Sequence, residues 1–452
     1  MVLRPVRLTR RRLLAGFGAT AVAGSAAPIH ARSQDPRRLA IDAMPASLPL
    51  GPDHHETTVW SLRTGGSSRI PRFRQGESVD AVVTNGLTAP LVLNWRGIDH
   101  AAAIEPLTAR SSISPEGIDR YVFPLRQAGT FMYDARLLGD GLAQPSPAQA
   151  LIVEEREPIE ADRDEVMLIE DWRLDAEGRP VAPGPSEIQT KVGPPLYLVN
   201  GKPSLDLNLH VNDRLRLRII NGCQRNAIAI AIQNLDVRVM AIDSQPAEPF
   251  LARNGRLVLA PGTRIDAVMD VTLAAGTASA ITLHDGGGNP RQIARLKVST
   301  DSPARSAPLP APPALPSANL PARLDLGSAL RTDLPLISPA GTSSAGTSSW
   351  DRPALFSTRR APAFRIKRGR TAVLALKNTT KTPMVFHLHG HHARLLDRLD
   401  DGWKPFWLDT VLVDAGQTQR IAFVADITGA WLIETMGVEW SAPRQVGWFA
   451  VE

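Results

Sequence analysis

The chain has 452 residues, of which 21% are charged, and a formal net charge of +6 at pH 7. Its first 31 residues carry five arginines and no acidic residue, so the rest of the chain is close to neutral, which excludes a nucleic-acid-binding protein with a basic surface. The 34 glycines and 38 prolines favour a turn-rich β protein, and the single cysteine excludes an intramolecular disulfide.

The N-terminal segment has the pattern of an export signal. A run of arginines ends at Arg12, and an apolar stretch rich in alanine and glycine then continues to Ala27. Residues 1–31 are therefore predicted to be a signal peptide, similar to the twin-arginine type that exports folded proteins. The stretch is shorter than the ~20 apolar residues of a membrane-spanning helix, so no stable transmembrane anchor is expected. The predicted location is the periplasm, reached through the twin-arginine export machinery.

One sequence pattern occurs three times after the signal. A turn residue precedes an asparagine by nine positions, and an apolar run lies between the two. The three pairs are Gly76 and Asn85, Asn212 and Asn221, and Gly369 and Asn378. The equal spacing indicates one hairpin unit used three times. In the middle copy Arg214, Arg216 and Arg218 alternate with apolar residues, which predicts a strand with one buried face.

A second strand pattern follows each of these units, at residues 115–129, 261–270 and 415–429. Apolar residues recur there at alternate positions, so each repeat is predicted to be a small antiparallel sandwich. The composition changes at residues 155–164, which are rich in charge, and at residues 302–317, which are rich in proline and alanine.

These changes in composition predict the domain boundaries. Three domains are expected, at residues 32–156, 157–301 and 321–452. A linker is expected at residues 302–320. A stretch rich in glycine, serine and threonine at residues 339–349 is expected to be a mobile loop of the third domain.

A histidine motif in the third repeat aligns with a related segment of the first repeat. Eighteen residues after Gly76 stands Asn94-Trp95-Arg96-Gly97, and eighteen after Gly369 stands His387-Leu388-His389-Gly390. The second motif resembles the His-x-His-Gly sequence of the multicopper oxidase family. Other segments similar to that family are Val199-Asn200-Gly201-Lys202-Pro203, Ala241-Ile242-Asp243, Leu259-Ala260-Pro261-Gly262 and Trp407-Leu408-Asp409-Thr410-Val411. The resemblance implies an all-β fold of three cupredoxin-like Greek-key β-sandwich domains preceded by the signal peptide.

The resemblance also shows which copper ligands are missing. In that family a blue copper, held by a thiolate and imidazoles, passes electrons along a His-Cys-His tripeptide to a three-copper cluster that reduces dioxygen. Of the cluster's histidines, only His387 and His389 stand at matching positions. The degenerate ligand positions are Asn94, Arg96, Asp134, Arg136, Glu434, Thr435, Met436 and Trp440.

Charged residues occupy four of the vacated positions. Arginine stays protonated and only donates hydrogen bonds, so it cannot replace a metal-binding imidazole. Buried charges persist only when they are paired. We therefore predict ion pairs among Arg96, Arg136, Asp134 and Glu434, with further hydrogen bonds to the two remaining histidines.

The dense histidine cluster has two interpretations. His387, His389 and His391 alternate, so they are expected to share one strand face. Together with Glu434 they form a candidate mononuclear metal site of the two-histidine-one-carboxylate kind. In the preferred interpretation the first two are hydrogen-bonded core residues, and His392 faces solvent.

These observations predict an exported, non-catalytic scaffold or binding protein. It is similar in kind to a copper-free branch of the superfamily that includes a cell-division protein, which implies a role in cell division or envelope maintenance and an envelope protein as partner. No cofactor is expected. The alternative is a residual copper-binding oxidoreductase that uses a mononuclear site at His387 and His389. Cys223 is predicted to be a small buried side chain.

Overall fold

The structure is a computed structural model of the chain. It describes residues 35–50, 56–65, 70–138, 144–184, 192–317, 320–336, 350–396, 402 and 404–452. Residues Pro36–Glu452 form one compact unit. The predicted signal peptide and the predicted loop at 339–349 lie outside the described residues. In the part of the chain that is described, no helix combines the length and apolar character needed to cross a membrane.

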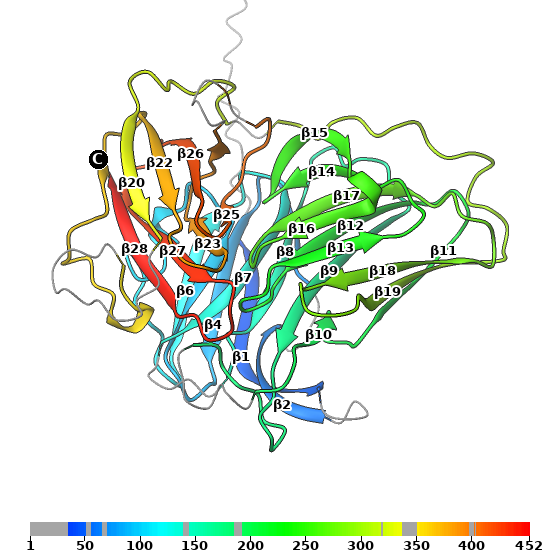
Figure 1. The fold of residues 1–452 in the computed structure, drawn as a ribbon, viewed down its shortest axis with the longest axis horizontal. Helices are drawn as coiled ribbons and strands as arrows, with labels where there is room; N and C mark the ends of the chain where they lie inside the picture. Colours follow the sequence, from blue (N-terminus) through cyan, green and yellow to red (C-terminus); the bar gives the residue numbers. More distant parts are fainter. Residues whose placement is uncertain are drawn as a thin grey trace, which may run out of the picture. The chain divides into compact units, whose positions relative to one another are not determined.

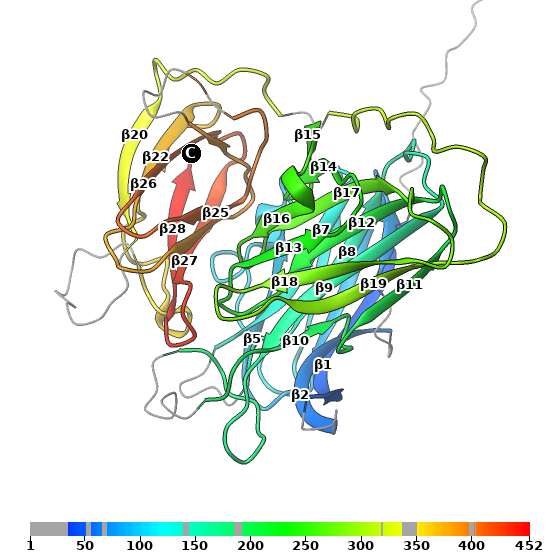
Figure 2. The same cartoon turned by 45° about the vertical axis from the view of Figure 1, so that its right-hand side comes forward.

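The described residues form three β-sandwiches in chain order, coloured blue to cyan, green, and yellow to red in Figures 1 and 2. Each sandwich encloses its own hydrophobic core. This confirms the predicted all-β fold of three cupredoxin-like domains.

The first sandwich consists of two four-stranded sheets. Its strands are β1 (Arg37–Pro49), β2 (Glu56–Thr64), β3 (Arg72–Arg74), β4 (Ser78–Asn85), β5 (Leu91–Arg96), β6 (Ile118–Pro124), β7 (Gly129–Leu137) and β8 (Ala148–Glu154), with the 3₁₀ turn η3 (Ala102–Ile104) between β5 and β6. One sheet has the order β2-β1-β4-β6, and the other has the order β3-β8-β7-β5.

The second sandwich has a six-stranded and a five-stranded sheet. Its strands are β9 (Arg163–Trp172), β10 (Leu196–Val199), β11 (Leu205–Leu209), β12 (Arg214–Asn221), β13 (Ile228–Ile232), β14 (Arg238–Ile242), β15 (Gln245–Leu251), β16 (Arg256–Leu259), β17 (Arg264–Asp270), β18 (Ala278–His284) and β19 (Arg291–Val298), with the turn η5 (Arg253–Gly255). The sheet orders are β10-β9-β12-β17-β14-β15 and β11-β19-β18-β13-β16.

The third sandwich repeats this plan. Its strands are β20 (Leu330–Pro335), β21 (Arg365–Ile366), β22 (Thr371–Lys377), β23 (Met384–Leu388), β24 (Arg394–Leu395), β25 (Thr410–Val413), β26 (Thr418–Val424), β27 (Gly429–Gly437) and β28 (Arg444–Val451), with the turn η6 (Pro353–Leu355). The sheet orders are β20-β22-β26-β24 and β21-β28-β27-β23-β25.

The three predicted repeats are structurally equivalent. Each begins at a residue with positive φ, at Gly76 (98°), Asn212 (67°) and Gly369 (80°), a backbone conformation that glycine and asparagine tolerate. The strand that follows is β4, β12 or β22. Each of these pairs in parallel with the first strand of its own sandwich and antiparallel with β6, β17 or β26.

The prediction of a hairpin at each repeat is wrong, because the chain crosses to the opposite sheet after the asparagine. Strands β4 and β5 lie in different sheets, as do β12 and β13, and β22 and β23. The asparagine side chain stabilises the crossing. In the first copy, Nδ2 of Asn85 donates to the carbonyl oxygens of Ala89 and Ile113, and Oδ1 accepts from the amide of Leu87. Asn221 and Asn378 make the same kinds of contact.

The prediction that β12 has only one buried face is also wrong. Its arginine face is buried as well, and Arg218 is 0% exposed. Arg216 donates to Glu155 at 2.7 and 2.9 Å and to Asp266 at 2.7 Å, while Arg218 donates to Asp164 at 2.7 and 2.8 Å. Asp266 also accepts a hydrogen bond from Thr130 of β7. These side chains therefore belong to a polar interface between the first and second sandwiches.

The proline-rich segment at residues 302–317 packs on the second sandwich. Leu315 is buried against Met240 and Val268. Nη2 of Arg214 donates to the carbonyl oxygens of Leu309 and Pro310 at 3.0 and 2.7 Å. The segment predicted as a linker is thus attached to the domain that precedes it.

Candidate functional site

The first and third sandwiches contain equivalent pairs of strands, and these strands carry the predicted site residues. Strands β5 and β7 pair so that Asn94 lies opposite Asp134. Strands β23 and β27 pair so that His387 lies opposite Glu434. The two pairs therefore occupy matching places in their sheets, as the equal spacing of the two sequence repeats predicts.

A buried ion pair joins these two sandwiches. Nε of Arg136 donates to Oε1 of Glu434 at 2.9 Å, and Nη2 donates to Oε2 at 2.6 Å. Nη1 of the same guanidinium donates to Asp134, which also accepts from Nδ2 of Asn94 at 3.0 Å. Arg96 lies 3.4 Å from both carboxylates. The predicted pairing of the four charged residues is confirmed, and we call Arg96, Asp134, Arg136 and Glu434 the central ion cluster.

Within the central ion cluster, Glu434 and Arg136 are held in their charged forms. Burial alone would raise the pKa of Glu434, but Arg136 and the neighbouring His389 hold it well below its usual range. Burial would likewise lower the pKa of Arg136, and the carboxylates of Asp134 and Glu434 raise it instead. Each sign of charge therefore keeps the other ionised inside the protein.

The two histidines of the His-x-His-Gly motif lie beside this cluster. Their ring centroids are 4.6 Å apart. Nδ1 of His389 lies 2.9 Å from Glu105, and Nε2 lies 3.6 Å from Glu434. Nδ1 of His387 lies 3.0 Å from the carbonyl oxygen of Asp409. His389 therefore contacts carboxylates of two domains, whereas the contacts of His387, which include the Thr410 hydroxyl at 3.2 Å and the Asp409 carboxylate at 3.6 Å, lie within its own domain.

The other two histidines lie in different surroundings. Strand β23 ends at Leu388, so the expectation that His391 continues the same strand face is wrong. Its ring packs in the third core, with ring centroids 5.0 Å from Trp431 and 5.3 Å from Phe423. The expectation that His392 faces solvent is also wrong. Its side chain is 0% exposed and connects all three sandwiches, as described next.

His392 links a loop of each neighbouring domain to the third. Nδ1 lies 2.7 Å from Oδ2 of Asp99 in the first sandwich, and Nε2 lies 2.8 Å from the carbonyl oxygen of Asp243 in the second. Since both partners are acceptors, the ring satisfies both contacts when both nitrogens carry protons. Burial alone would lower the pKa of His392, but Asp99 raises it to about 9.

The stability of the protein is expected to fall as the pH rises from about 6.5 to 9. Burial alone would lower the pKa of His389, but Glu105 and Glu434 raise it to about 9, as Asp99 does for His392. A pKa raised above its unfolded value of 6.5 adds stability below that pH and loses it as the pH rises through 9. The loss is on the order of 3 kcal/mol for each imidazole. Urea unfolding at pH 7.0 and 9.5 measures it.

Two variants identify the source of this pH dependence. His389→Gln and His392→Gln are each expected to lower stability at pH 7.0 and to flatten its dependence on pH. The exposed His210→Gln is the control, because its side chain is 46% exposed. A pH profile that both buried substitutions leave unchanged would show that other groups are responsible.

A second buried ion pair joins the second and third sandwiches. Arg264 of β17 is 0% exposed, and its Nη1 and Nη2 donate to the two oxygens of Asp409 at 3.0 and 2.7 Å. Asp243 accepts from the amides of Asp409 and Thr410 at 3.2 and 3.1 Å. Burial, with the nearby Asp409, raises the pKa of Asp243 to about 7. We call Arg264, Asp243 and Asp409 the Arg264 ion cluster.

Sequence reasoning missed several of these residues. Asp243 and Asp409 stand in segments that resemble the multicopper oxidase family, and an acid inside an apolar strand segment is the signal that could have identified them. Asp99 and Glu105 stand in the connection between β5 and β6, where no sequence pattern marks them. Their roles follow only from the docking of the third sandwich.

The side chains at the remaining degenerate ligand positions are packed in the interior. Met436 packs against Ala260 and Val385 at the interface of the second and third sandwiches. Trp440 lies under the guanidinium of Arg173, 5.1 Å from ring centroid to Cζ. Thr435 is buried. None of these groups is a strong copper ligand.

The donor set does not fit the copper centres of the family. A blue copper needs a thiolate and two imidazoles, and Cys223 lies in the second sandwich with its thiol 3.8 Å from the carbonyl oxygen of Ile169. Burial raises the pKa of that thiol well above its usual value. In the described ranges, no group of three or more histidine, cysteine, aspartate or glutamate side chains is placed to hold a metal ion.

The fold and the site define a protein of three cupredoxin-like domains that are joined by buried ion pairs. Family models described as multicopper oxidase match residues 54–157, 164–281 and 334–440. The chain belongs to the multicopper oxidase family.

Known proteins of this family are similar over most of the chain. The multicopper oxidase MmcO of Mycobacterium tuberculosis is 25% identical over 86% of this chain and 82% of its own length. Copper resistance protein A of Pseudomonas syringae pv. tomato is 23% identical over 62% of this chain and 55% of its own length. A crystal structure of a multi-copper oxidase from Pseudomonas thermotolerans is 25% identical, with a TM-score of 0.74, and covers 92% of this chain and 99% of that chain.

Proposed function

We propose that this protein is a non-catalytic member of the multicopper oxidase family that acts as a scaffold or binding protein in the periplasm. The central ion cluster is the observation that carries the proposal. Arg136 and Glu434 stand at positions where the family resemblance expects imidazoles, and they bind each other at 2.6 and 2.9 Å. Because arginine only donates hydrogen bonds, these positions supply charge pairing in place of metal ligation.

The arrangement of ion pairs is suited to a rigid scaffold. Arg136 and Glu434 join the first and third sandwiches, Arg264 and Asp409 join the second and third, and Arg216 with its partners joins the first and second. Each pair of domains is thus held by at least one buried ionic contact. Such contacts fix one orientation between domains, because any displacement leaves a charge unpaired in the interior.

A role in cell division or envelope maintenance is the cellular part of the proposal. It is supported by the predicted twin-arginine signal and by the likeness in kind to a copper-free branch of the superfamily. The expected partner is a protein of the envelope. Cross-linking in intact cells, followed by identification of the partners that are lost when export is blocked, tests this part.

Copper loading tests the proposal directly. The purified protein, incubated with excess copper and then dialysed, is expected to retain well below one copper per chain and to show no blue colour. It is also expected not to oxidise a phenolic dye, because the described residues place no set of thiolate and imidazole ligands that can hold the metal. Copper analysis, visible absorption and dioxygen consumption are the measurements. Stoichiometric copper with catalytic dioxygen consumption would contradict the proposal.

A second candidate function is a copper-binding oxidoreductase with a single metal at His387 and His389. The close approach of the two rings favours it, as does Nε2 of His389, which has no hydrogen-bond partner. The charge around the site opposes it. Glu105 and Glu434 raise the pKa of His389 to about 9, so the ring is protonated at neutral pH and cannot ligate a metal without losing a proton.

The metal content of one variant distinguishes the two candidate functions. His387→Ala is expected to leave the low metal content of the scaffold protein unchanged. In the second candidate, one equivalent of tightly bound copper would be present in the natural chain and would be lost in His387→Ala. His284→Ala is the matched control, because this histidine ends strand β18 of the second sandwich, outside the candidate site.

A further inference from the structure

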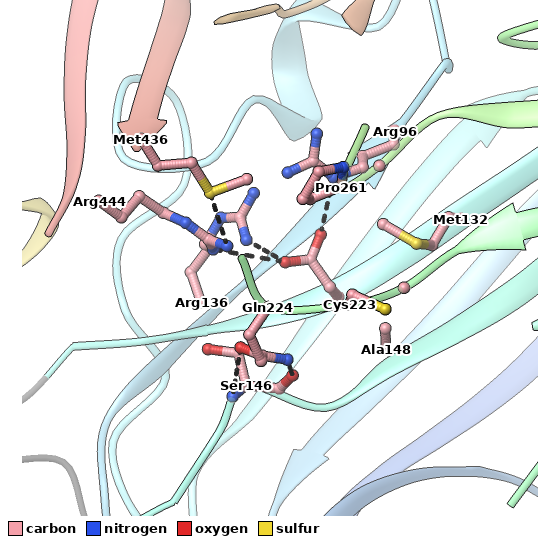
Figure 3. Close-up of a pocket in the computed structure, with 13 residues that line it drawn as sticks. Arg96, Met132, Arg136, Ser146, Ala148, Cys223, Gln224, Pro261, Met436 and Arg444 are labelled. Atoms are coloured by element: carbon pink, nitrogen blue, oxygen red, sulfur yellow. Dashed lines mark hydrogen bonds and ion pairs between the residues drawn. The ribbon is translucent and has the colours of Figure 1, made fainter. Parts of the chain in front are cut away.

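A small pocket with an enclosed volume of about 20 Å³ opens beside the central ion cluster. Figure 3 shows the guanidinium groups of Arg96, Arg136 and Arg444 on its upper and left sides. The sulfur atoms of Met132 and Cys223 lie on its right side. We call this the Arg444 pocket. Arg444 and Ser146 are partly exposed at its mouth, so a small solute can reach it.

The surroundings of the Arg444 pocket carry more positive than negative charge. Arg96 and Arg136 share the carboxylates of Asp134 and Glu434. Arg444 has only a long contact of 3.9 Å to Asp134. A further cation stands behind the pocket wall and is described next. Two carboxylates thus face three guanidinium groups that line the pocket.

Arg225 is the additional cation. It is buried, and its Nε and Nη1 donate to the carbonyl oxygens of Ala442 and Gln224 at 2.9 and 2.7 Å. Both Arg225 and Arg444 place a nitrogen 3.8 Å from the sulfur of Met436. No carboxylate in the described part of the chain forms an ion pair with Arg225 at 4.0 Å or less. Four guanidinium groups therefore lie close to three carboxylates, those of Asp134, Glu434 and Asp171.

The pocket also contains unused hydrogen-bond donors. Arg96 is only 3% exposed, yet its Nη1 has no hydrogen-bond partner, and neither has Nε of Arg444. A buried donor without an acceptor destabilises the protein. Gly262, with φ of +95°, lets this guanidinium approach, because a Cβ there would lie 2.8 Å from Nη1 of Arg96. The geometry thus presents free N–H groups to a cavity with excess positive charge.

The lowered pKa values of Arg96 and Arg225 agree with this geometry. Burial, and then the repulsion of Arg136, lower the pKa of Arg96. The same two causes lower the pKa of Arg225 to about 10. An anion in the pocket would oppose both shifts. A metal cation is disfavoured at this place, because it would be repelled by the guanidinium groups and because burial keeps the thiol of Cys223 protonated.

We propose that the Arg444 pocket binds a small anion, either a carboxylate or an inorganic oxyanion, between Arg96 and Arg444. The ligand is limited to the smallest anions, because the enclosed part of the pocket has room for only one or two water-sized groups. Guanidinium groups are suited to such ligands, because their planar N–H donors match the oxygens of a carboxylate or phosphate. This inference goes beyond the proposed function, since a copper-free scaffold needs no bound anion.

Isothermal titration calorimetry of the purified protein with acetate and with phosphate, at constant ionic strength, tests the inference. Saturable binding of at least one of the two anions is expected, and the comparison tells which class is bound. Arg444→Gln is expected to weaken that binding about tenfold or more, because it removes a charge-assisted hydrogen bond. Arg444→Lys, which keeps the charge but loses the planar fork, is expected to weaken it less.

The control variant is Arg305→Gln, whose arginine is 24% exposed and pairs with Asp162 outside the pocket. It is expected to bind the anion as the natural chain does. Circular dichroism checks that each variant is folded. If Arg444→Gln does not fold, Arg444→Lys alone decides, since unchanged affinity in a folded Arg444→Lys would overturn the proposal. Absence of saturable binding of both anions to the natural chain would also overturn it. Neither result depends on whether the protein binds copper.

Discussion

Glu434→Gln is expected to lower the free energy of unfolding by about 3–5 kcal/mol. The amide keeps the size of the side chain but removes its charge. Arg136 then loses the partner that it binds at 2.6 and 2.9 Å, and Arg96 loses one of its two carboxylates. Both guanidinium groups are nearly fully buried, so water cannot replace the lost partner. In the variant, Asp134 is the one carboxylate of the described residues that is left within 4.0 Å of the guanidinium groups of Arg96 and Arg136, and His389 also loses a charged partner.

Equilibrium unfolding in urea, followed by tryptophan fluorescence and by circular dichroism, measures this effect. The matched control is Glu452→Gln, which removes a carboxylate from an ion pair whose two side chains are 57% and 58% exposed. That control is expected to change stability little, because water solvates both partners. A Glu434→Gln protein as stable as the Glu452→Gln protein would show that the central ion cluster contributes no net stability.

Arg264→Leu is expected to destabilise the docking of the third sandwich on the second, also by about 3–5 kcal/mol. The substitution leaves the carboxylates of Asp409 and Asp243 buried without their cation. Burial and the nearby Asp409 already raise the pKa of Asp243 to about 7, so loss of the arginine would raise it further. The variant is therefore expected to lose most stability at high pH, where both carboxylates must ionise.

A double-mutant cycle separates the ion pair from general disruption. Asp409→Asn is expected to cost less in the Arg264→Leu background than in the natural chain, since the carboxylate it removes has already lost its partner. Arg295→Gln is the control, because Arg295 pairs with Asp206 at the surface and is 48% exposed. Additive effects of the two substitutions would mean that Arg264 and Asp409 do not stabilise one another.

Much of the architecture could be predicted because it depends on local patterns. The nine-residue spacing that ends at Asn85 recurs at Asn221 and Asn378, and all three asparagines make equivalent hydrogen bonds. Such spacing identifies equivalent strands without any knowledge of their partners. The same spacing could not tell a hairpin from a crossing between sheets. That choice depends on whether the next strand finds its hydrogen bonds in the same sheet or in the opposite one.

The misplaced side chains have a common physical cause. Apolar residues and arginines alternate along β12, so they lie on opposite faces of the strand. A face that carries arginines usually faces solvent. Here that face is covered by the first sandwich, so Arg216 and Arg218 are buried against carboxylates. His392 is buried for the same reason, between loops of the other two sandwiches. A sequence pattern shows which residues share a face of a strand. It does not show whether another domain covers that face.

The sequence by itself determined the family, the three repeats and the identity of the side chains at the ligand positions, because these are properties of neighbouring residues and fixed spacings. Only the tertiary structure decided which charges meet. Arg136 and Glu434 are 298 positions apart, and Glu105 and the amide of Leu432 are 327 apart. Such pairs form only when whole sandwiches dock, because salt screens the attraction between charges that lie more than about 10 Å apart in solution.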